Sequence, residues 1–130
     1  MNQHEVMFAR EFIIPEKRDR YVSLMGSVKG RKKIVAGFHH IRDLDDRYAK
    51  LIPSNQQSGE SIYRLLKQKG APEICYIMSD DSAIDQKELP LREAIFKVEG
   101  TNFGTLVSCI AGKLAYFETE DLSRRYILAK

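Results

Sequence analysis

The last third of the chain, from residue 104 to residue 130, carries the pattern that most restricts the fold. Three short apolar runs follow one another there, Thr105–Ile110, Lys113–Thr119 and Arg124–Ala129, with turn-forming residues between them. Runs of this length, rich in β-branched and aromatic residues, predict strands, and short connections predict antiparallel neighbours. This end of the chain therefore predicts a sheet that the preceding half must cover.

A fourth strand and a helix are predicted just before these runs. The segment Ile74–Met78 is apolar on both alternating faces, which indicates a central strand covered on both sides. Pro90 then opens a helix that ends near Val98, and the residues before it, from 79 to 88, are typical of a turn and a loop. If the strands before and after this helix pair in parallel, the crossover is right-handed. The expected sheet is mixed and has about four strands.

The first half of the chain is predominantly helical in pattern. A helix is expected after Pro15, with an apolar stripe and Gly30 as its stop. Residues 31–41 fit a helix better than a strand, because their apolar residues share one helical face, although the strand alternative stays open. These two helices predict a hairpin around Gly30. A third helix begins at Ser54 or Ser58 and ends at Gly70.

These elements predict one α+β domain over residues 1–130. An N-terminal layer of about three helices packs on a mixed, mostly antiparallel sheet of about four strands. A length of 130 residues with 43% hydrophobic residues suits a single core. Residues 1–14 are too apolar for a free tail, so they are expected to pack against that core.

Composition also bounds the class of protein. Cys75 and Cys109 stand inside apolar runs without a metal-binding spacing, which predicts buried reduced thiols. No apolar run approaches the roughly 20 residues that span a bilayer, and no signal-peptide pattern is seen. A cytoplasmic protein without a membrane partner is therefore expected.

The charge is unevenly distributed along the chain. Residues 1–70 hold 14 Lys/Arg against 8 Asp/Glu, a balance of +6, whereas residues 71–130 hold 7 against 10, a balance of −3. The densest basic run, with further cations at positions 17, 18 and 20, comprises Lys29, Arg31, Lys32 and Lys33. Cations on one hairpin can neutralise several phosphates or meet an acidic protein, so nucleic acid and an acidic protein are the candidate partners. The alternative is an ordinary solvated surface.

Two histidines raise the question of a metal. If the helix continues, His39 and Asp43 stand at i and i+4 and face one ion, with His40 beside them. A divalent ion needs a third ligand, which the spacing does not supply. No metal and no cofactor are predicted, and the alternative is a surface ion pair.

A catalytic alternative rests on four residues. Asp80 and Asp81 directly follow the central strand, where paired carboxylates can act as general acid or base, although Asp also dominates ordinary turns. Cys109 is a candidate nucleophile with His39 or His40 as its base, against the alternative of a small core residue. With no complete catalytic motif, the favoured function is a non-catalytic binding module. A small enzyme or ligand-binding protein with a pocket beside Asp80 and Asp81 is the alternative.

Overall fold

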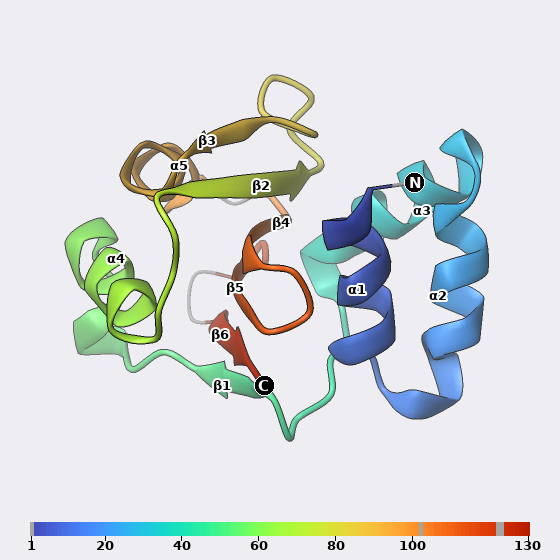
Figure 1. Cartoon of the computed structure of the whole chain (residues 1–130), viewed down its shortest axis with the longest axis horizontal. Coiled ribbons are helices and arrows are strands. Elements are labelled where there is room, and N and C mark those ends of the chain that lie inside the picture. Colours follow the sequence, from blue (N-terminus) through green and yellow to red (C-terminus); the bar gives the residue numbers. More distant parts are fainter. Residues whose placement is uncertain (1, 102, 122–123) are drawn as a thin grey trace.

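The protein is an α+β domain in which a six-stranded sheet lies between two groups of helices (Figure 1). The computed structural model describes residues 2–101, 103–121 and 124–130. The helices are α1 (Gln3–Glu11), α2 (Arg18–Met25), α3 (Val28–Ala36), α4 (Gly59–Gln68) and α5 (Leu91–Val98). The strands are β1 (Ala49–Leu51), β2 (Ile74–Ser79), β3 (Glu88–Pro90), β4 (Thr105–Ile110), β5 (Leu114–Glu118) and β6 (Arg125–Ala129). Three short 3₁₀ helices are η1 (Pro15–Lys17), η2 (Gly37–His40) and η3 (Ser54–Gln56).

The strand order is β1-β6-β5-β4-β2-β3, and every neighbouring pair is antiparallel. The three predicted C-terminal strands and the central strand β2 are present, but the expected mixture of directions is not. A parallel crossover from β2 to β4 was possible in the prediction, whereas Ile77 pairs with Val107 in antiparallel register. The reason is β3, which reverses the chain once more before α5 begins.

Two edge strands account for the difference between about four strands and six. β1 pairs with β6 and β3 pairs with β2, and each has only three residues. Strands this short show no periodicity of their own, so the sequence predicted helical spacing near the first and a loop before the second. Each of these two strands is defined by its pairing with a longer neighbouring strand.

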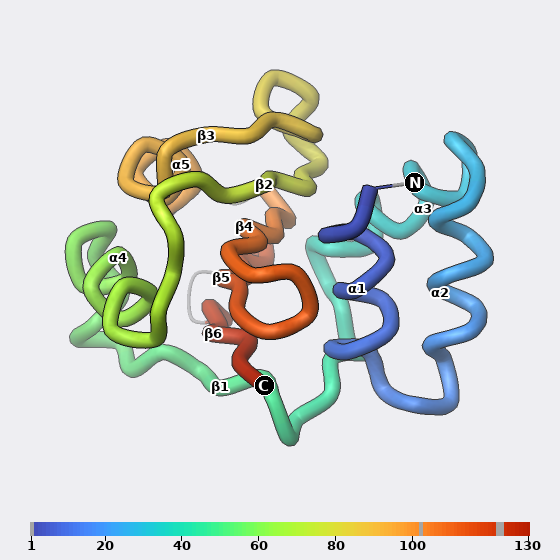
Figure 2. The backbone as a smooth tube through the Cα atoms, viewed as in Figure 1, coloured from blue at the N-terminus to red at the C-terminus, as the bar shows by residue number. Residues whose placement is uncertain are grey.

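Successive side chains along the strands point alternately to the two faces of the sheet, and each face has its own hydrophobic core. Ile77, Val107 and Tyr116 point to the face covered by α4 and α5. Their neighbours on the opposite face join the core beneath α1, α2 and α3; among them are Met78, Leu106 and Phe117. Figure 2 shows the chain leaving the α1–α3 layer, passing through β1 and reaching α4 on the other side of the sheet.

The N-terminal helices differ in their boundaries from the expected ones. Residues 1–14 had no predicted element, but most of them form α1, with Phe8 buried against Phe38 and Phe117. α2 ends at Met25 rather than near Gly30, because the side chain of Ser27 caps a new helix by accepting a hydrogen bond from the Gly30 N–H at 3.0 Å.

The prediction of helix for residues 31–41 is confirmed as far as Ala36, and η2 continues the turn to His40. The start of the third helix is settled at Ser58, whose hydroxyl accepts from the Ser61 N–H at 3.2 Å. No helix among the described residues has the length and apolar character needed to cross a membrane.

Candidate functional site

α2 and α3 form a tightly packed hairpin, and α3 carries all four predicted binding residues. Their closest approach is at Gly30, where an added Cβ would lie 2.2 Å from the backbone oxygen of Leu24. Only glycine fits such an approach. The hairpin is therefore fixed by backbone contact, which also fixes the position of the α3 side chains relative to those of α2.

Arg31, one of the four predicted binding residues, turns away from the other three. Its side chain is only 14% exposed, and Nη2 donates a hydrogen bond to Glu5 Oε2 at 2.8 Å. Nη1 and Nη2 also donate to Asp85, each at 2.8 Å, and the hydroxyl of Tyr76 donates to the same Glu5 oxygen. Hydrogen bonding to Asp85 is the largest of the influences that raise the pKa of Arg31. Arg31 thus joins α3 to α1, β2 and the following loop.

The three lysines remain together on the surface of α3. Lys29, Lys32 and Lys33 are exposed and occupy one side of the helix, since three- and four-residue steps separate neighbours on a helical face. Ile34 and Val35 occupy the buried side. We call this row of three lysines the α3 lysine stripe.

The stripe ends in a pocket of about 240 Å³ between α2 and α3. Three cations line this pocket, Lys17, Arg20 and Lys33. Its remaining lining residues are Tyr21, Leu24, Ile34, Gly37 and Asp43. The α2 residues in these sets recur at three- and four-residue steps, which is the one signal in the sequence that places them on a common face.

Asp43 organises one side of the pocket. Its Oδ1 accepts a hydrogen bond from Lys17 Nζ at 3.0 Å, and its Oδ2 accepts one from the Tyr21 hydroxyl at 2.7 Å. Burial alone would raise the pKa of Asp43, but these two hydrogen bonds outweigh it and the pKa is lowered. Burial and the contact with Asp43 together raise the pKa of Tyr21. The carboxylate is therefore charged at neutral pH and holds Lys17 in place.

His39 does not share a site with Asp43. Its Nε2 lies 2.7 Å from Asp80 Oδ2, and its Nδ1 lies 3.7 Å from Glu120 Oε2. The considered metal pair of His39 and Asp43 is thus not formed, because Asp43 is engaged by Lys17 and Tyr21. No group of three or more metal-ligating side chains that could hold an ion occurs in the described part of the chain.

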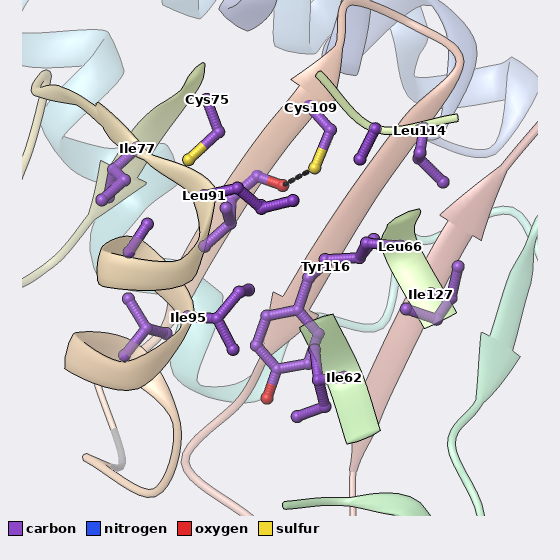
Figure 3. Packing of buried hydrophobic residues seen from close by; sticks show 14 of the residues in the cluster. Ile62, Leu66, Cys75, Ile77, Leu91, Ile95, Cys109, Leu114, Tyr116 and Ile127 are labelled. Carbon is purple, nitrogen blue, oxygen red and sulfur yellow. Dashed lines mark hydrogen bonds between the residues drawn. The ribbon is translucent and has the colours of Figure 1, made fainter. Parts of the chain in front are cut away.

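The four catalytic candidates are only partly brought together. His39 and Asp80 are in hydrogen-bond contact, although 41 positions separate them. Asp81 instead accepts a hydrogen bond from the Ala83 N–H at 3.0 Å and so caps its own turn. Cys109 is buried on the α4–α5 side of the sheet (Figure 3), the face opposite the Phe38 cluster that adjoins His39.

Burial is the main cause that raises the pKa of both thiols, Cys75 and Cys109. A protonated thiol inside a core is a poor nucleophile. Both cysteines are free, as the sequence predicted.

A second, larger hollow lies beside η2. Its volume is about 600 Å³ and it mixes basic, acidic and apolar side chains. Its lining includes His39, His40, Arg42, Asp46, Arg124 and Tyr126. Asp80 and Asp81 are not part of that lining, so the predicted pocket beside them is represented only through the contact of Asp80 with His39.

Comparison with known protein families, with curated proteins and with solved structures gives no significant match, so the functional argument depends on the residues of the site.

Proposed function

We propose that this protein is a non-catalytic module that binds nucleic acid through the α3 lysine stripe and the adjoining pocket. The observation that carries the proposal is the meeting of Lys17, Arg20 and Lys33 in one pocket, with Lys29 and Lys32 exposed beyond it. Lys17 comes from η1, Arg20 from α2 and Lys33 from α3, so three elements contribute positive charge to this part of the surface. Such a surface neutralises phosphates and releases their counterions.

The proposed interface differs in one residue from the predicted one. Arg31 belongs to the internal network with Glu5 and Asp85, so its role is to hold α3 in position. Lys17 and Arg20 take its place at the surface. The proposed partner is still an anionic one. The substitutions that test the interface now include Lys17 and Arg20 and leave out Arg31.

The non-catalytic part of the proposal is supported by the surroundings of the catalytic candidates. Cys109 is 4% exposed and lies on the face of the sheet opposite the core cluster of Phe38, the residue next to His39, so a nucleophile and base pair of Cys109 and His39 is not favoured. Two free cysteines suit a cytoplasmic location, where thiols stay reduced.

The test is the salt dependence of binding to a fluorescently labelled single strand. A variant with Lys29, Lys32 and Lys33 all changed to Gln is compared with wild type. Each lost phosphate contact lowers the log–log salt slope by about 0.7 on single strands, so the slope should fall by about 2. A matched control changes three other exposed lysines without ion pairs among the described residues, Lys69, Lys97 and Lys113, to Gln.

The outcomes separate the alternatives. The control variant should bind like wild type, because its lost charges lie outside the proposed interface. Equal loss of binding in both triple variants would show a general charge effect and contradict the proposal. If the protein instead captures an acidic protein, and added DNA or RNA does not displace it, the partner is an acidic protein and the proposal of nucleic acid is contradicted.

We propose a small enzyme as the second candidate function, because the hydrogen bond between His39 and Asp80 borders the larger hollow. Hydrolysis of chromogenic ester and phosphoester substrates by wild type, lost in a His39→Gln variant, would support it. No turnover above that of the variant would remove it.

A further inference from the structure

We propose that the pocket between α2 and α3 takes a phosphate monoester at the end of a nucleic-acid strand. This inference rests on the proposed function and adds the chemical group that the pocket selects. Lys17, Arg20 and Lys33 contribute three positive charges, and Asp43 contributes one negative charge. The net charge of these four side chains is +2. A terminal phosphate carries about −1.5 to −2 at pH 7, so it matches this charge more closely than a phosphodiester, which carries a single negative charge.

Among the described residues, Asp43 accepts a hydrogen bond from one of the three cations that line the pocket, Lys17. Both oxygens of Asp43 already accept a hydrogen bond, one from Lys17 and one from Tyr21. Arg20 and Lys33 form no ion pair with a described residue, although the charge of Arg20 contributes to lowering the pKa of Asp43. Their donors are therefore available to phosphate oxygens, and a guanidinium can bind two such oxygens at once.

The size and the walls of the pocket suit a small group. A volume of about 240 Å³ is below the range typical of sites for drug-sized ligands, which suits a single phosphate group better than a whole nucleotide. Leu24, Ile34 and Gly37 form a wall without charge. Apolar walls reduce the local dielectric and so strengthen the attraction between the cations and the phosphate.

The α3 lysine stripe identifies the rest of the ligand. Lys29 stands one helical turn from Lys33, with about 5–6 Å between their Cβ atoms. A nucleic-acid strand whose terminal phosphate occupies the pocket presents further phosphates to Lys29 and Lys32. A phosphorylated peptide lacks this series of charges, which is why the stripe favours nucleic acid.

The experiment compares three strands of one sequence by fluorescence anisotropy at constant salt. One strand has a 5′-phosphate, one a 3′-phosphate and one no terminal phosphate, each labelled away from the tested end. We expect a terminal phosphate to tighten binding about tenfold, the effect of roughly one added charge-assisted hydrogen bond. Equal affinity for all three strands would overturn the proposal.

Two charge-matched variants locate the effect. Changing Arg20 and Lys33 to Gln should abolish the preference for the phosphorylated strand. Changing Lys29 and Lys32 to Gln should weaken all three strands and preserve the preference. The opposite assignment, or a preference retained in both variants, would place the terminal phosphate elsewhere and overturn the inference.

The proposed function and this inference fail in different ways. Salt-dependent binding that ignores the terminal phosphate leaves the interface standing and removes only the monoester site. Loss of neither binding nor preference in any of these variants contradicts both. Tighter binding of a phosphoserine peptide than of every strand would overturn the assignment to nucleic acid.

Discussion

Arg31 on α3 donates a hydrogen bond to Glu5 on α1, with 2.8 Å between Nη2 and Oε2. Both side chains are largely buried, at 14% and 4% exposure. This ion pair holds α3, which carries the proposed interface, against α1. Arg31 therefore has a structural role, although it belongs to the basic run of the sequence.

The first prediction concerns this ion pair. An Arg31→Gln variant leaves the Glu5 carboxylate buried without its cation, and removing one partner of a buried pair costs about 3–5 kcal/mol of unfolding free energy. The exposed neighbour provides the control, since Lys32→Gln should change that free energy by less than about 0.5 kcal/mol. Urea unfolding of both variants measures the difference. Similar stability of the two would show that Arg31 is not part of a buried network in solution.

A second prediction uses two glycines of the same hairpin. An alanine Cβ at position 30 would lie 2.2 Å from the Leu24 oxygen, so Gly30→Ala should destabilise the protein by about 1–3 kcal/mol. At Gly37 an added Cβ meets nothing within 4 Å and the φ of −79° is open to any residue. Gly37→Ala should therefore stabilise by about 0.4–1 kcal/mol. Thermal unfolding that ranks the two variants in the opposite order would contradict the close approach of α2 and α3.

The third prediction is a dependence of stability on pH that is due to Asp45. Hydrogen bonds from Arg47 are the main cause that lowers the pKa of Asp45 from 3.8 to about 2 in the folded protein. Because the pKa of Asp45 is lower in the folded state than in the unfolded state, the charged carboxylate stabilises the fold at any pH above the unfolded pKa. This stabilisation is lost as the pH falls from about 4 to about 2. The stability gap between wild type and Asp45→Asn should close over that range. Asp46→Asn, at an exposed neighbour, is the control; a gap that stays constant with pH would be evidence against the shift.

The last prediction addresses the thiols. Cys75 and Cys109 are 2% and 4% exposed, so neither should react with a disulfide reagent until the protein unfolds. Both should react in urea. A Ser82→Cys variant, which places a thiol on the exposed turn after β2, should react at once and shows that the reagent is effective. Rapid reaction of the native wild type would reopen Cys109 as a nucleophile.

The longer elements could be predicted from the sequence, because the patterns that define them are local. β4 has the predicted bounds, and β2, β5, β6 and α5 begin or end within a residue or so of theirs. Their apolar alternation or helical spacing is long enough to be read without a partner. Burial of both cysteines followed from the same apolar runs.

The edge strands, the strand order and the composition of the site depend on contacts between distant segments of the chain. β1 and β3 are defined by their pairing with β6 and β2. A segment of three residues is too short to show a strand pattern in the sequence. The sequence placed Lys29, Arg31, Lys32 and Lys33 in one set, but Glu5 and Asp85, which are distant in the chain, draw Arg31 inward. Arg20 of α2 and Lys33 of α3 line one pocket, and the close approach of Gly30 to Leu24 brings these two helices together. Charge and periodicity are properties of a segment, whereas which charges meet depends on long-range packing.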